Sequence, residues 1–226
     1  MCILFDLDGT LLDTGPDFFH AINAVRTAEG LTLLPDSTLP LVRLAVTHGI
    51  SGLVEAGFGF KNNTEENHAI GIRLLQAYDQ ILGVYSQPFP GIDRLLHTLD
   101  QREIPWGIVT NKDSLRTYPL LDRLTWLDSA ATIVCGDTTP LPKPHPAPLL
   151  HAAKELDVSP SLCIYVGDAE RDIIAGKAAG MSTVAALFGY VEDIHEAKNW
   201  AADIYVHHAD EILPVYEKWL ECVYTL

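Results

Sequence analysis

The chain has 226 residues, which suits one large domain or one domain with a smaller insertion, and its 48% hydrophobic content can bury a core. The formal net charge of −15 argues against nucleic-acid binding, which needs a basic surface. No apolar run reaches the roughly 20 residues that span a membrane, and the first residues lack the pattern of a signal peptide. We therefore expect a cytoplasmic protein that binds neither nucleic acid nor membrane.

The first part of the chain changes early from a strand pattern to a helical one. Residues 3–5 are apolar and end at a turn, which predicts a short buried strand. Apolar residues then recur at helical spacing over residues 17–30, 37–46 and 64–82. No strand alternation stands out between residues 15 and 86. This stretch is predicted to be all-helical.

Beyond a proline-rich segment at residues 87–91, helix and strand patterns alternate. Helices are predicted over residues 92–102, 114–124, 147–155, 170–179 and 210–222, and strands over residues 105–109, 131–135, 162–166, 183–186 and 204–206. This alternation favours an α/β fold, a Rossmann-like parallel sheet flanked by helices. Because the first strand precedes the helical stretch, we predict an α/β core domain of residues 1–14 and 89–226, interrupted by a helical domain of residues 15–88.

Polar side chains follow several of the predicted strands, at the sheet edge where ligands bind in such folds. Asp6 and Asp8 are two residues apart at a strand end, so both can point the same way, and they repel unless a cation lies between them. Asp168 follows another strand, and three carboxylates together suit Mg²⁺. Asp172, in the first turn of the next helix, can hold the metal's waters or orient a neighbour.

Four segments in this order resemble the haloacid dehalogenase superfamily. They are the motif DxDGT at residues 6–10, an apolar strand that ends in Thr110, a lysine before proline at Lys143, and the motif GDxxxD at residues 167–172. The resemblance extends over nearly the whole chain. It implies the α/β core described above and a helical cap domain inserted after the first motif.

The resemblance also implies a role for each matched residue. Asp6 would attack phosphorus and form an aspartyl-phosphate, and Asp8 would protonate the leaving group and later activate water. Thr110 and Asn111 would hold phosphoryl oxygens through the hydroxyl and a backbone N–H, and Lys143 would neutralise charge on the nucleophile and the phosphoryl group.

Mg²⁺ is the implied cofactor. Its expected ligands are Asp6, the backbone carbonyl of Asp8, and Asp168, with Asp172 outside the direct ligands. Lys112, Glu170 and Arg171 are expected instead to be solvated surface charges.

The inserted domain is where the resemblance places substrate recognition. Arg43, which could pair with a substrate carboxylate, and His48, in the turn at residues 47–51, are candidates; the other interpretation of Arg43 is a solvated helix charge. Three segments are similar to the phosphoglycolate phosphatase group, which includes N-acetylmuramic acid 6-phosphate phosphatases: residues 140–150, 189–190 and 199–203. We expect a small phosphorylated metabolite as substrate and a monomer or homodimer.

Single residues argue against two other activities of the superfamily. A dehalogenase of the superfamily lacks the second acid of DxD, so Asp8 favours phosphoryl chemistry. A phosphonate hydrolase would need a Schiff-base lysine in the cap, and the surroundings of Lys61 do not resemble that arrangement. Another sugar phosphatase and a phosphosugar mutase stay open. A non-catalytic phosphometabolite-binding protein is the alternative of another class, against which the full set of acids with Lys143 argues.

Overall fold

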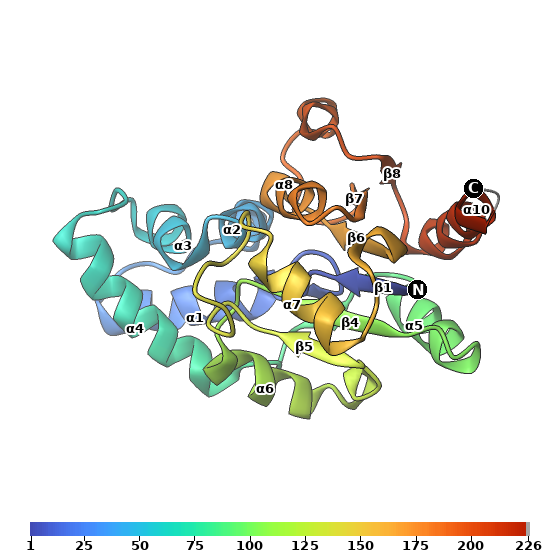
Figure 1. Ribbon diagram of the computed structural model, residues 1–226. Helices are drawn as coiled ribbons and strands as arrows, with labels where there is room; N and C mark the ends of the chain where they lie inside the picture. Colours follow the sequence, from blue (N-terminus) through green and yellow to red (C-terminus); the bar gives the residue numbers. More distant parts are fainter. Residues whose placement is uncertain (225–226) are drawn as a thin grey trace. The chain divides into compact units, whose positions relative to one another are not determined.

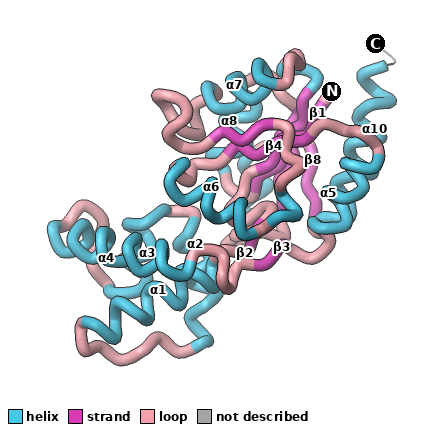
Figure 2. Tube along the Cα trace, turned by 90° about the horizontal axis from the view of Figure 1, so that it is seen from below, coloured by secondary structure: helices cyan, strands magenta, loops and turns pink. Residues whose placement is uncertain are grey.

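The computed structural model describes residues 1–224, apart from the side chains of Trp126 and Tyr224. The chain divides into two compact units (Figures 1 and 2). The first, here called the core unit, comprises Met1–Leu11 and Pro88–Leu226, and the second, the inserted unit, comprises Leu12–Gln87. The chain thus leaves the core unit once, after its first strand, and returns once.

The core unit is built on one parallel sheet with the strand order β5-β4-β1-β6-β7-β8. The strands are β1 Cys2–Phe5, β4 Trp106–Val109, β5 Thr132–Val134, β6 Cys163–Gly167, β7 Ser182–Ala186 and β8 Ile204–Val206. The chain runs outward from β1 in both directions, so β1 lies at the point where the strand order reverses. Ligands of open parallel sheets bind at such a point, beyond the carboxyl ends of the strands.

Helices flank this sheet, as the alternation of patterns predicted (Figure 1). They are α5 Ile92–Gln101, α6 Ser114–Arg123, α7 Ala147–Glu155, α8 Glu170–Ala178, α9 Ile194–Ala197 and α10 Ile212–Tyr224. All four residues of β1 and all five of β6 are buried. The central strands are continuous apolar runs because helices cover both faces of the sheet. The predicted α/β fold is confirmed.

The inserted unit consists mainly of four helices: α1 Gly15–Ala28, α2 Leu39–Val46, α3 Gly49–Phe58 and α4 Glu65–Ile81. The rings of Phe18 on α1 and Tyr78 on α4 stack with centroids 4.0 Å apart. Two features differ from the sequence pattern. Strand β2 (Leu12–Asp13) pairs with β3 (Gln87–Pro88), and both are too short to show alternation. Helix α3 was not predicted, since it contains three glycines, which lower helix propensity.

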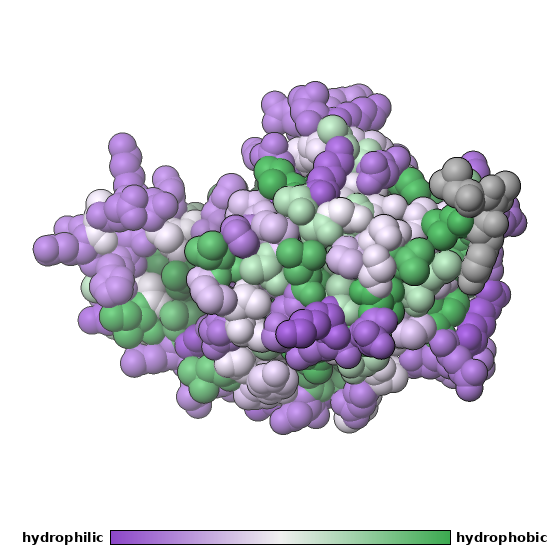
Figure 3. Space-filling view, in the orientation of Figure 1, coloured by the Kyte–Doolittle hydropathy of each residue, from purple (hydrophilic) through white to green (hydrophobic). Residues whose placement is uncertain are grey.

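The surface carries apolar and hydrophilic residues side by side. Figure 3 shows them interspersed on the face in view. Among the described residues, no helix is both long enough and apolar enough to span a membrane.

A buried carboxylate ties the start of the inserted unit to its end. Asp17 on α1 is fully buried and accepts hydrogen bonds from the backbone N–H groups of Gly83 and Tyr85, at 2.7 and 2.6 Å, and from the hydroxyl of Ser86 at 2.6 Å. All three donors belong to the segment that follows α4. One side chain therefore satisfies the polar groups of a turn that has no regular secondary structure.

Replacing Asp17 by alanine is expected to lower the free energy of unfolding by about 2–4 kcal/mol, because three donors lose their acceptor in a buried place. Urea denaturation measures this, with Asp122→Ala, at an exposed position of α6, as the control. A loss of less than about 1 kcal/mol for Asp17→Ala would mean that water replaces the carboxylate at little cost.

Candidate active site

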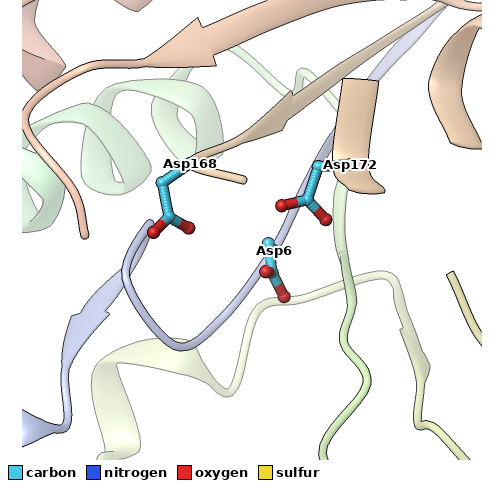
Figure 4. Close-up of side chains that lie close together, drawn as sticks. All are labelled: Asp6, Asp168 and Asp172. Atoms are coloured by element: carbon cyan, nitrogen blue, oxygen red, sulfur yellow. The ribbon is translucent and has the colours of Figure 1, made fainter. Parts of the chain in front are cut away.

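The residues of the four motifs meet at the carboxyl edge of the core sheet. Asp6 follows β1, Asp168 and Asp172 follow β6, and Lys143 lies in the loop between β5 and α7. Figure 4 shows the three carboxyl groups close together, and one oxygen of each lies within 4.8 Å of the others. All three aspartates are at most 2% exposed. Three acids in so small a buried space require positive charge nearby.

Lys143 supplies part of that charge. Its Nζ lies 2.9 Å from Asp6 Oδ1 and 2.7 Å from Asp172 Oδ1. It is also 2.9 Å from the carbonyl oxygen of Val109 and 2.7 Å from the hydroxyl of Tyr165. An ammonium group has three donors, so these four oxygens surround it fully. The lysine is thus held between Asp6 and Asp172 at one position.

Asn111 fixes the backbone that carries this lysine. The Asn111 Oδ1 accepts the N–H of Lys143, and Asn111 Nδ2 donates to the Lys143 carbonyl, both at 2.9 Å. The Asn111 side chain therefore holds the backbone of Lys143 in place. Thr110 is 2% exposed, and its hydroxyl accepts the N–H of Lys112 at 3.1 Å.

Tyr165 is a residue of the site that the sequence pattern did not reveal. Its hydroxyl lies 2.9 Å from the carbonyl of Val109 and 3.3 Å from Asp172 Oδ1, in addition to the contact with Lys143. It sits in the apolar run of β6, where a tyrosine looks like an ordinary core residue. Burial raises the pKa of this hydroxyl well above its usual value, and the charges of Asp172 and Asp6 add to the effect.

Asp168 is held by the loop of the first motif and by a backbone group. Its Oδ1 accepts the Thr10 hydroxyl at 2.8 Å, and its Oδ2 accepts the N–H of Tyr190 at 3.0 Å. Gly9 has φ of +92°, and a Cβ there would lie 2.2 Å from Asp168 Oδ2. The glycine of DxDGT is therefore needed both for its backbone conformation and for the approach of this carboxylate.

Burial, together with the neighbouring charges of Asp6 and Asp172, raises the pKa of Asp168 to about 7, although the hydrogen bonds from Thr10 and Tyr190 act in the opposite direction. Burial also raises the pKa of Asp6, although the Lys143 ammonium counteracts it. Both shifts express an excess of negative charge at the site.

This donor set fits a hard divalent cation. Carboxylate oxygens are the ligands that Mg²⁺ prefers, and an added cation would relieve the repulsion that raises the pKa of Asp168. Asp6 and Asp168 are the carboxylates best able to hold it. Asp172 is engaged instead, because its Oδ1 faces Lys143 and its Oδ2 accepts the N–H of Ala169 at 3.1 Å.

Comparison with known proteins decides the family. Residues 3–186 match the family model of haloacid dehalogenase-like hydrolases. The chain belongs to this family. The resemblance inferred from the four motifs is thereby confirmed.

Three proteins illustrate where the chain lies within the haloacid dehalogenase-like hydrolases. It is 39% identical to the phosphoglycolate phosphatase of Xanthomonas campestris pv. campestris over 210 residues, 93% of each chain. It is 36% identical to the N-acetylmuramic acid 6-phosphate phosphatase of Pseudomonas aeruginosa over 218 residues, 96% of this chain and 95% of the other. The crystal structure of a predicted phosphoglycolate phosphatase from Haemophilus somnus superposes with a TM-score of 0.78 at 26% identity, covering 95% and 96% of the two chains.

Lys112 and Arg171 were expected to be solvated surface charges, and for both this expectation is wrong. Lys112 Nζ lies 3.1 Å from Asp8 Oδ1, and only 7% of the Lys112 side chain is exposed. Arg171 Nη2 lies 4.0 Å from Asp6 Oδ2, and its side chain is 25% exposed. Glu170, in contrast, is exposed. The signal that could have found both cations is their position: Lys112 lies in the loop after β4 and Arg171 in the first turn of α8, each next to residues of the motifs.

The two candidates for substrate recognition lie in the inserted unit. Arg43 on α2 forms an ion pair with Asp13, with its Nε 3.0 Å from both carboxylate oxygens and its Nη2 2.5 Å from Oδ2. This contact argues against Arg43 being only a solvated helix charge. His48 is the exposed N-cap residue of α3. That Arg43 or His48 contacts the substrate stays a prediction.

Proposed function

We propose that this hydrolase is a Mg²⁺-dependent phosphatase that cleaves a small phosphate monoester through an aspartyl-phosphate on Asp6. The observation that carries the proposal is the ammonium of Lys143, held 2.9 Å from Asp6 Oδ1 in a buried cluster with Asp168. An acid held in this way is kept available as a carboxylate in a place that otherwise disfavours charge.

In the first step a carboxylate oxygen of Asp6 attacks phosphorus. The bond from phosphorus to the ester oxygen breaks, its electron pair stays on that oxygen, and the oxygen takes a proton from Asp8. Lys143 compensates charge on Asp6 and on the transferring phosphoryl group. The hydroxyl of Thr110 and the backbone N–H of Asn111 are assigned to the phosphoryl oxygens.

In the second step water attacks phosphorus of the aspartyl-phosphate while Asp8 takes a proton from it. The bond between phosphorus and Asp6 breaks, and Asp6 leaves as a carboxylate. Asp6, the backbone carbonyl of Asp8, and Asp168 would hold Mg²⁺, which supplies positive charge toward the phosphoryl oxygens when it is bound. Asp172 keeps Lys143 in place through both steps.

The inserted unit is proposed as a cap that closes over the site and reads the leaving group, with Arg43 and His48 as candidate contacts. We place the cap at residues 15–88 and the catalytic core at residues 1–14 and 89–226. The names of the relatives favour 2-phosphoglycolate as substrate, with N-acetylmuramic acid 6-phosphate next. A cytoplasmic monomer or homodimer is part of the proposal.

The test is phosphate release from a panel of esters, with Mg²⁺ and with EDTA. The panel contains 2-phosphoglycolate, N-acetylmuramic acid 6-phosphate, hexose phosphates, a simple alkyl phosphate and p-nitrophenyl phosphate, with Asp6→Asn as the inactive control. We expect Mg²⁺-dependent release that is fastest from one of the first two. Transfer of phosphate between sugar positions without release would indicate a mutase instead, and no turnover of any ester would indicate a binding protein.

Mg²⁺ is expected to raise the melting temperature more at pH 8 than at pH 5.5. Folding raises the pKa of Asp168 from 3.8 to about 7, so between these values the folded chain binds more protons than the unfolded chain. Stability without metal therefore falls as the pH rises through this window. A bound cation offsets that loss, and at pH 5.5 it must first displace the proton.

Thermal melts in EDTA and in Mg²⁺ at the two pH values measure this difference. The variant Asp168→Asn, which cannot ionise at this position, should abolish most of it. Equal stabilisation by Mg²⁺ at both pH values would contradict a site built on Asp168.

A further inference from the structure

Asp8 has a charged partner that the two steps above do not use. Lys112 Nζ lies 3.1 Å from Asp8 Oδ1 and 3.3 Å from Oδ2, so the ammonium contacts both carboxylate oxygens. Only 7% of the Lys112 side chain and 14% of the Asp8 side chain are exposed. Ion pairs screened in this way from water are stronger than those on the surface. This pair therefore restricts where the Asp8 carboxyl group can lie.

The backbone of Lys112 is fixed by two neighbouring loops. Its N–H donates to the Thr110 hydroxyl at 3.1 Å, and its carbonyl accepts the N–H of Gly136 at 2.8 Å. Gly136 has no room for a side chain, because a Cβ there would lie 2.3 Å from the carbonyl oxygen of Asn111. The loops after β4 and β5 thus hold the base of the lysine in one place.

The location of Lys112 is unfavourable for a cation in the absence of a partner. The residue stands directly before Asp113, the N-cap of α6, whose side chain accepts the N–H of Arg116 at 3.0 Å. Helix N-termini carry partial positive charge and disfavour a nearby cation. The contact with Asp8 offsets this disadvantage.

We propose that Lys112 is a positioning residue that holds the Asp8 carboxyl group toward the leaving oxygen. The inference rests on the proposed function. When the ester bond breaks, its electron pair goes to the ester oxygen, that oxygen takes the proton of Asp8, and Asp8 remains as a carboxylate facing the ammonium of Lys112. The same contact holds Asp8 when it later accepts a proton from water.

The leaving group distinguishes this role from others. An alkyl phosphate needs a proton on its leaving oxygen, whereas p-nitrophenolate leaves without one. For Lys112→Met we expect kcat/KM to fall by about 10- to 100-fold on an alkyl phosphate and by less than about 3-fold on p-nitrophenyl phosphate. With the second ester, a burst of nitrophenolate should precede slow turnover, because the water step also needs Asp8. Lys112→Arg should restore most of the activity on the alkyl phosphate.

Two controls separate this role from a structural one. Lys154→Met makes the same exchange at an exposed position of α7 and should leave both esters unaffected. In an Asp8→Asn background, Lys112→Met should cause no further loss, because Lys112 acts through Asp8. That double variant also removes both charges of the pair, so it keeps the comparison available if Lys112→Met alone folds poorly.

Equal losses on the two esters, or a further loss in the Asp8→Asn background, would overturn the proposal. Either result would place Lys112 on the phosphoryl group or in the fold. Hydrolysis by the wild-type enzyme in the ester panel decides the proposed function separately, so these outcomes concern Lys112 alone.

Discussion

Replacement of Lys143 by methionine is expected to reduce kcat by at least about 100-fold and to lower the free energy of unfolding by about 3–5 kcal/mol. Both effects have one cause. The side chain is fully buried between Asp6 and Asp172, and methionine leaves two buried carboxylates without their cation. Phosphate release and urea denaturation in EDTA measure the two losses. Lys154→Met, at an exposed position, is the matched control.

A second substitution separates the two effects of Lys143. The double variant Lys143→Met/Asp172→Asn removes one of the two buried carboxylates that Lys143→Met leaves without a cation, so much of the lost stability should return. Activity should not return, because Asp6 and the phosphoryl group still lack the ammonium. If the double variant recovered activity as well, Lys143 would serve only to balance Asp172. If Lys143→Met kept the stability of the wild type, the buried ion pairs would contribute nothing net to the fold.

The backbone part of this site could be predicted from sequence because the motifs follow buried strands. A parallel strand buried on both faces has a recognisable apolar run, and its carboxyl end fixes where the next residue lies. Asp6, Thr110 and Asp168 follow such runs, and the structure places all three at one edge of the sheet. The helix α3 escaped prediction because its glycines hide the helical pattern.

Long side chains were harder to place than backbone. A lysine in a loop or an arginine in a first helical turn is usually solvated, and only the structure shows that Lys112 reaches Asp8 and that Arg171 approaches Asp6. Tyr165 was hidden for another reason. Its hydroxyl contacts the carbonyl of Val109 on β4 and the ammonium of Lys143, and both partners are distant from it in sequence. Position at a strand end predicts membership of a site, while the partner of a long side chain depends on tertiary packing.

Asp6→Asn is expected to lower kcat by at least about 10⁴-fold for every ester, because the amide cannot form the covalent intermediate. The same variant should be at least as stable as the wild type in EDTA at pH 8. Burial raises the pKa of Asp6, the Lys143 ammonium counteracts this and repulsion by Asp172 adds to it; because the net shift is upward, the ionised side chain costs stability in the metal-free fold. The asparagine oxygen can still accept the N–H of Leu7, which lies 2.7 Å from Asp6 Oδ1.

Urea denaturation of the wild type, Asp6→Asn and the exposed control Asp122→Asn measures this stability, and the ester panel measures the activity. Loss of activity with unchanged or greater stability is typical of a residue placed for chemistry at the expense of the fold. A fall of more than about 2 kcal/mol for Asp6→Asn would show that attraction to Lys143 outweighs the burial of the charge. Activity that survives in Asp6→Asn would remove Asp6 as the nucleophile, since the amide cannot form the covalent intermediate.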